Sequence, residues 1–92
     1  MSDRQLHLAA NGVFIVTDKH EVIVTLPSFE WDFSPGDVFL RSVDEELAFR
    51  QIGSGNHEGR PTVTLRPLVP WNEVDSFFQE LGVGTLSIVR TA

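Results

Sequence analysis

The fold is decided by residues 6–26, which read LHLAANGVFIVTDKHEVIVTL. Apolar and polar side chains alternate on both sides of Asn11-Gly12, and such alternation is typical of half-buried strands. An Asn-Gly pair favours the left-handed backbone of a two-residue hairpin turn. Asp18-Lys19 allows a second tight reversal. We therefore predict a three-stranded antiparallel meander, with Leu8 opposite Ile15 and Ile15 opposite Val22.

One face of this predicted meander is continuously apolar. Pairing through the two turns also places Ala10 opposite Val13 and Val13 opposite Val24. Because side chains alternate along a strand, that face collects Leu6, Leu8, Ala10, Val13, Ile15, Val22, Val24 and Leu26. The second face is also partly apolar and carries Ala9, Phe14, Val16 and Ile23. A sheet that is apolar on both sides has to be covered on both sides, by the rest of the chain or by a second subunit.

The remaining sequence predicts further strands and one helix. The expected strands are 29–33, 38–43, 46–52, 60–66 and 84–90, with a tight turn at Asp44-Glu45 and a flexible loop over 53–59. Val63 and Leu65 are expected to face inward. The fold class is therefore mainly β with one helix: seven or eight short antiparallel strands form a small barrel or a two-layer sandwich, and the helix precedes the last strand.

The helix is expected over residues 70–82. Val74, Phe77, Phe78 and Leu81 are three, four and seven positions apart, which places them on one helical face. Asn72 is the expected cap at the start and Gly82 the expected terminator. This helix would cover one open end or one face of the sheet.

Length and composition limit the classes of protein. The 92 residues form one domain, 1–92, and the net charge is −6. The acidic charge opposes general affinity for nucleic acid and is compatible with a basic partner. The sequence has no cysteine and no apolar run long enough for a membrane helix. No secretory signal is visible, so we expect a cytoplasmic protein without membrane contact.

An arginine face is the first candidate binding surface. The Asp44-Glu45 turn would place Leu40 opposite Phe49, Val38 opposite Gln51, Phe39 opposite Arg50 and Arg41 opposite Ala48. Arg41, Arg50, Arg66 and Phe39 would then share the outer side of the sheet. Such a face suits a carboxylate, a phosphate or an acidic partner surface. The alternative, which we favour, is a solvated face whose arginines pair with nearby acids.

Aromatic residues and a histidine supply the other candidates. Phe29, Trp31 and Phe33 alternate along one segment, either as a recognition patch or, as we favour, as core. His57 and Glu58 form an acid–base pair in the glycine-rich loop. The histidines of the chain are not expected to converge on a metal, and no cofactor motif is present.

The sequence favours a binding protein over an enzyme. The first hypothesis is a non-enzymatic module that recognises a protein partner, of the inhibitor, immunity or phage and mobile-element accessory type; a homodimer is also compatible. The alternative is a small-ligand barrel whose apolar pocket, lined by Phe77, Phe78, Trp31 and Phe33, includes an arginine that reads an acidic group. A hydrolase that uses His57 and Glu58 ranks last. The candidate binding residues are Arg41, Arg50, Arg66, Phe39, Trp31, Phe33 and His57.

Overall fold

Seven antiparallel strands form one curled sheet in the described part of the chain. The computed structural model describes residues 5–43, 45–80 and 86–91. The strands are β1 (Gln5–Ala9), β2 (Gly12–Val16), β3 (Glu21–Thr25), β4 (Gly36–Arg41), β5 (Glu46–His57), β6 (Arg60–Pro67) and β7 (Ser87–Thr91). Their order across the sheet is β1-β7-β4-β5-β6-β3-β2. The predicted fold class, mainly β with a single helix before the last strand, is confirmed.

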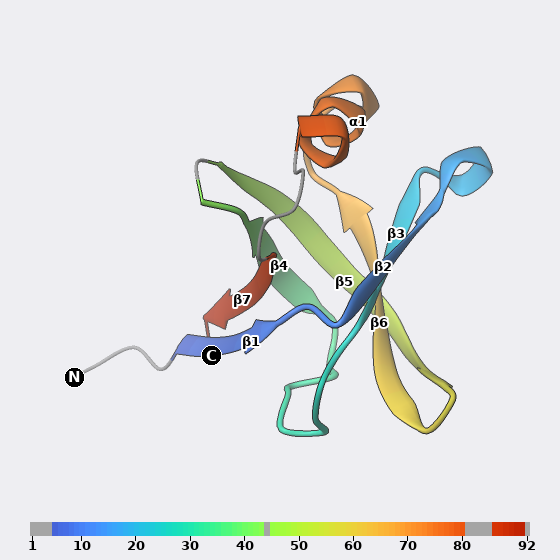
Figure 1. Ribbon diagram of the computed structural model, residues 1–92, viewed down its shortest axis with the longest axis vertical. Helices are drawn as coiled ribbons and strands as arrows, with labels where there is room; N and C mark the ends of the chain where they lie inside the picture. The colour runs from blue at the N-terminus through green and yellow to red at the C-terminus, as the bar shows by residue number, and fades with distance from the viewer. Residues whose placement is uncertain (1–4, 44, 81–85, 92) are drawn as a thin grey trace.

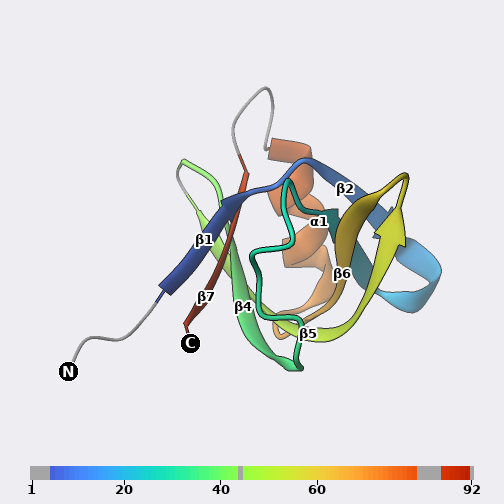
Figure 2. The same ribbon diagram turned by 90° about the horizontal axis from the view of Figure 1, so that it is seen from below.

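The helix and one irregular segment lie at opposite ends of the curled sheet. Helix α1 (Trp71–Glu80) lies at one end, and the segment 26–35 crosses the other (Figures 1 and 2). Val74 and Phe77 project from α1 into the core, and Trp31 enters it from the irregular segment. The core between these ends includes Val22, Val24, Val38, Leu40, Phe49, Val63, Leu65 and Ile88.

The predicted Asn11-Gly12 hairpin is wrong. Neither residue has the positive φ that the tight turn requires. The Ala10 N–H donates to the Leu86 carbonyl and the Asn11 N–H to the Thr25 carbonyl, each at 2.8 Å. Two consecutive amides therefore point to opposite sides, and the chain passes from pairing with β7 to pairing with β3.

The neighbour of β1 is therefore β7, and not β2 as predicted. Leu8 pairs with Ile88, and not with Ile15. The predicted β2–β3 register is confirmed, since Val13 pairs with Val24 and Ile15 with Val22. The facing prediction holds for Leu6, Leu8, Ala10 and Val13, which pack against the core, whereas Ile15 is 43% exposed.

Two other predictions are also wrong, the strand over 29–33 and the loop over 53–59. Residues 29–33 are irregular, with bends at Phe29 and Trp31, and the Asp32 carboxylate accepts hydrogen bonds from the Ser34 backbone and hydroxyl. Residues 53–57 belong to β5 and are not a loop. The reversal contracts to Glu58-Gly59, whose φ angles are 52° and 80°.

Small shifts affect the β4–β5 turn and the helix start. The Ser42 N–H donates to the Glu45 carbonyl, so Val38 pairs with Phe49, two residues away from the predicted Gln51. Helix α1 begins at Trp71, and Asn72 therefore lies inside its first turn. Asp44, and the predicted helix end at Leu81 and Gly82, lie outside the described residues.

Buried polar side chains attach the irregular segment to the sheet. Gln51, which is fully buried in β5, donates to the carbonyls of Asp32 and Ser34 at 2.9 Å each. Its Oε1 accepts the Trp31 Nε1–H at 2.8 Å. Arg90 of β7 donates to the same two carbonyls and lies 3.6 Å from the Asp32 carboxylate. These contacts hold the irregular segment 26–35, which does not pair as a strand, across the end of the core.

Candidate functional site

The outer side of β2, β3 and β6 carries an exposed aromatic residue. Directly opposite residues share one face of a sheet, and the register aligns Phe14 with Ile23 and Thr64. A second row aligns Gly12, Thr25 and Thr62. The other face of these strands is the buried core. Phe14 is 50% exposed, although it stands in the middle of β2.

The β5–β6 hairpin brings His57 onto the same outer side. Gly55 pairs with Thr62, and His57 follows two positions later on the same face. The His57 ring meets the Phe14 ring edge to face, with centroids 5.5 Å apart and planes inclined at 69°. Phe14 of β2 and His57 of β5 therefore touch on the outer side of the sheet, although β3 and β6 lie between their two strands.

Two adjoining hollows share this aromatic pair. One, of about 400 Å³, is lined by Phe14, Ile23, Asn56, His57 and Thr62. The other, of about 470 Å³, is lined by Asn11, Gly12, Phe14, Thr25, His57, Glu58 and Arg60. We call the two together the outer groove. Its floor is formed by Ile23, Thr25 and Thr62, its wall is the aromatic pair, and Asn56, Glu58 and Arg60 provide a hydrogen-bonding rim.

Gly55 packs closely against Thr62, whose side chain lines the outer groove. A Cβ at Gly55 would lie 3.1 Å from the Thr62 hydroxyl oxygen, closer than ordinary contact. The Thr25 and Thr62 side chains are nearly buried beneath the rim. A partner group that enters the groove thus meets hydroxyls below and an aromatic wall beside it.

Each arginine of the predicted arginine face has an acidic partner. Arg41 lies 2.6 Å from Glu46, Arg50 lies 3.3 Å from Asp37, and Arg66 lies 3.2 Å from Glu21. Arg50 and Arg66 are directly paired across β5 and β6. Arg41 stands at the far end of β4, opposite Glu46 and not Ala48. The structure therefore brings together two of the three arginines.

The predicted aromatic candidates are largely structural. Phe39 is half-buried and lies opposite Ala48, so the predicted pairing with Arg50 is wrong. Trp31 is buried and hydrogen-bonded to Gln51. Phe33 packs against the core and lines a hollow of about 160 Å³ with Phe29, Ser54, Gly55 and Pro61. Phe29 itself is 63% exposed.

His57 and Glu58 are poorly placed for acid–base chemistry. The His57 Nε2 lies 3.9 Å from the Glu58 carboxylate, beyond hydrogen-bond distance, and both side chains are exposed. The contact that orients His57 is with Phe14. Sequence reasoning placed Phe14 on an apolar outer face but did not predict this contact, because it arises from the curl of four strands.

Comparison with protein-family models, curated proteins and solved structures finds no match to the chain. None of the described helices has the length and apolar character needed to cross a membrane. The geometry of the outer face is therefore the basis for any assignment of function.

Proposed function

We propose that the protein is a non-enzymatic module that binds a protein partner through the outer groove. The main observation behind this proposal is that Phe14 is half-exposed on the outer side of the sheet and lines both hollows of the outer groove. Aromatic side chains surrounded by polar groups are typical anchors of protein interfaces. An exposed aromatic in mid-strand is otherwise a solvation cost, because its apolar surface remains in contact with water.

The expected partner segment carries an apolar side chain that packs on Phe14 and Ile23. Its backbone polar groups would meet Asn56, His57 and Arg60 at the rim, which supply amide, imidazole and guanidinium groups. The two hollows lie side by side, so a loop or an extended segment is a better fit than a single small molecule. A second copy of the chain is one partner that would meet these requirements.

Packing opposes the alternative of a ligand pocket between sheet and helix. Phe77 and Trp31 are buried in the core, and Phe78 packs against it. These side chains fill the space that an apolar ligand would occupy. We therefore give preference to the outer face.

Site-specific photo-crosslinking tests this function. Benzoylphenylalanine is placed at position 14 or 23 in the full chain, and in separate control proteins at position 29 or 43. Phe29 and Val43 are the matched controls, because both are apolar and exposed outside the groove. We expect the same protein to cross-link from positions 14 and 23 and not from 29 or 43. Equal cross-linking from position 43, or none from position 14, contradicts the proposal.

A purified partner allows a quantitative test. Phe14→Ser is expected to weaken binding at least about tenfold, as truncation of an interface anchor typically does. Phe29→Ser removes an even more exposed aromatic ring, outside the groove, and is expected to leave the affinity unchanged. Isothermal titration calorimetry measures both, and circular dichroism verifies that each variant remains folded.

A further inference from the structure

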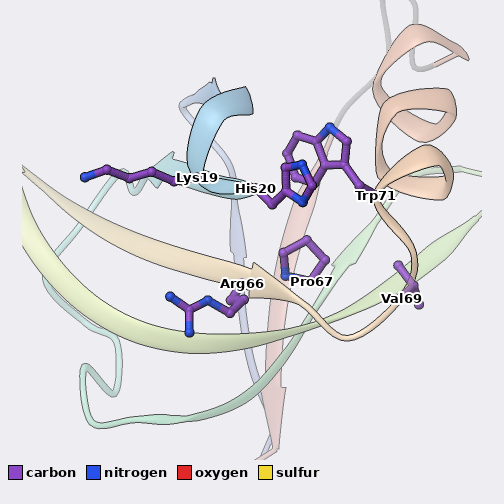
Figure 3. A pocket seen from close by; sticks show the side chains of 6 residues that line it. All are labelled: Lys19, His20, Arg66, Pro67, Val69 and Trp71. Atoms are coloured by element: carbon purple, nitrogen blue, oxygen red, sulfur yellow. The ribbon is translucent and has the colours of Figure 1, made fainter.

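Another hollow lies apart from the outer groove, between the β2–β3 connection and the start of α1. It has a volume of about 230 Å³ and is lined by Lys19, His20, Arg66, Pro67, Val69 and Trp71. The lining residues come from three separate parts of the chain (Figure 3). This volume is below the range of drug-sized sites and suits a small molecule.

Positive charge gathers at this hollow although the chain as a whole is acidic. Lys19, the only lysine in the sequence, and Arg66 both line it, whereas the net charge of the protein is −6. Figure 3 shows the two cationic side chains extending to the same side of the hollow. Two cations on one side of a concave surface attract an anion more strongly than either does alone.

The guanidinium of Arg66 is oriented by an acid that leaves most of its donors free. Its Nη2 donates to Glu21 at 3.2 Å, and the Glu21 side chain is only 15% exposed. Among the described residues, Glu21 is the acceptor of the Arg66 side chain, and a guanidinium has five N–H donors in a planar fork. Lys19 is the second cation that lines the hollow.

A stacked aromatic pair forms another part of the lining of this hollow. The His20 ring stacks on the Trp71 indole, with centroids 4.8 Å apart and planes inclined at 5°. His20 has a left-handed backbone, with φ of 51°, and its N–H donates to the Thr17 carbonyl at 3.1 Å. A left-handed backbone is uncommon for a residue other than glycine and persists where surrounding contacts hold it. The backbone of the β2–β3 connection therefore holds the His20 ring against Trp71.

We propose that this hollow binds a small organic acid. The oxyanion lies against Lys19 and Arg66, and the apolar part of the molecule lies against Trp71, Pro67 and Val69. The proposal is independent of the protein-binding function, because it uses none of the residues of the outer groove. The ligand class is defined by an anionic head and a compact apolar body.

Sodium benzoate is the probe, observed by NMR on the full chain. We expect it to shift the Trp71 indole signal and the amide signals of His20 and Arg66, with saturation in the millimolar range. The buried Trp31 indole is an internal control and is expected to remain unshifted. Benzamide, which has the same ring without the charge, and acetate, which has the charge without the ring, are both expected to bind at least tenfold more weakly. Equal affinity for either one overturns the proposal.

Two variants test which groups hold the oxyanion. Lys19→Gln and Arg66→Gln are each expected to weaken benzoate binding at least threefold. Arg41→Gln is the matched control, since Arg41 is also an exposed arginine paired with one glutamate, and it is expected to have no effect. Unchanged affinity in both Lys19→Gln and Arg66→Gln overturns the proposal, and the NMR spectra verify that each variant is folded.

Discussion

At the scale of single residues, Gln51 joins three parts of the molecule. It stands on a central strand, is fully buried, and contacts Trp31, Asp32 and Ser34 through three hydrogen bonds. A buried polar side chain is stabilising only while its partners are satisfied. The Gln51 side chain therefore has a structural role and is not a candidate functional residue.

Replacement of Gln51 by leucine is expected to destabilise the protein by about 2–4 kcal/mol. The substitution leaves the Trp31 Nε1–H without its acceptor, and an unsatisfied buried group costs about 1–3 kcal/mol. Urea unfolding measures the change. Gln79→Leu is the control, because Gln79 is exposed and donates to the exposed Asp75 carboxylate, and it is expected to change stability by less than about 0.5 kcal/mol. A similar effect of both substitutions contradicts the role of Gln51.

Asp32 gives stability a dependence on pH. The Ser34 hydroxyl and backbone N–H, followed by the charge of Arg90, lower the pKa of Asp32 from its ordinary value of 3.8. A lowered folded-state pKa means that the unfolded chain binds the proton more tightly. The stabilisation is therefore complete above the unfolded-state pKa and is lost as pH falls through the folded-state pKa.

Asp32→Asn is expected to remove this dependence. The wild type is expected to be more stable than Asp32→Asn at pH 6. The difference between their free energies of unfolding is expected to become smaller as pH falls below about 4. Urea unfolding between pH 2 and pH 6 measures it. Asp37→Asn, which removes an exposed carboxylate outside the buried contacts, is the comparison. A difference that is constant over the whole pH range contradicts the assignment.

At the scale of secondary-structure elements, the structure departs from the prediction both at the expected Asn11-Gly12 turn and in the expected loop over 53–59. Asn11-Gly12 is the stronger local signal, yet the chain runs through it, because each of its halves gains a neighbouring strand. Glu58-Gly59 was predicted as part of a longer loop and is the actual tight turn. Local propensity is worth about 1 kcal/mol, whereas burial of Leu8 and Val13 against the core contributes more.

Two glycine substitutions distinguish these outcomes. Gly12→Ala is expected to be nearly neutral, since its Cβ would lie an ordinary 3.7 Å from the Thr25 hydroxyl and no positive φ is needed. Gly59→Ala is expected to cost about 1–2 kcal/mol, because its φ of 80° disfavours any side chain. Thermal unfolding measures both. If Gly12→Ala destabilised the protein more than Gly59→Ala, the result would support a tight hairpin turn at residues 11–12.

At the scale of the whole molecule, the sequence predicted the facing of strands better than their neighbours. Alternation set the inward side of Val22, Val24, Val63 and Leu65 correctly, since it depends only on the strand itself. The pairing of β1 with β7 left no local signal, because it joins segments from opposite ends of the described chain. The outer groove was not predictable for the same reason: Phe14 and His57 meet only when the sheet curls.

Folding kinetics are expected to reflect this topology. The β2–β3 hairpin joins adjacent segments and forms at low entropic cost, whereas β1–β7 closes a very long loop. Val24→Ala is therefore expected to slow folding, with a φ value of about 0.5, and Leu8→Ala mainly to speed unfolding, with a φ value below about 0.3. Stopped-flow measurements in urea provide both values. A higher φ value at Leu8 contradicts this order of events.

The pairing of β1 with β7 also has a consequence for biosynthesis. Residues 5–9 leave the ribosome long before residues 87–91, at roughly 5–20 residues per second. For several seconds the nascent chain therefore presents Leu6 and Leu8 on a strand that has no neighbour. We expect the apolar side chains of β1 to be accessible to chaperones during that interval, which a slower-translating messenger RNA would lengthen.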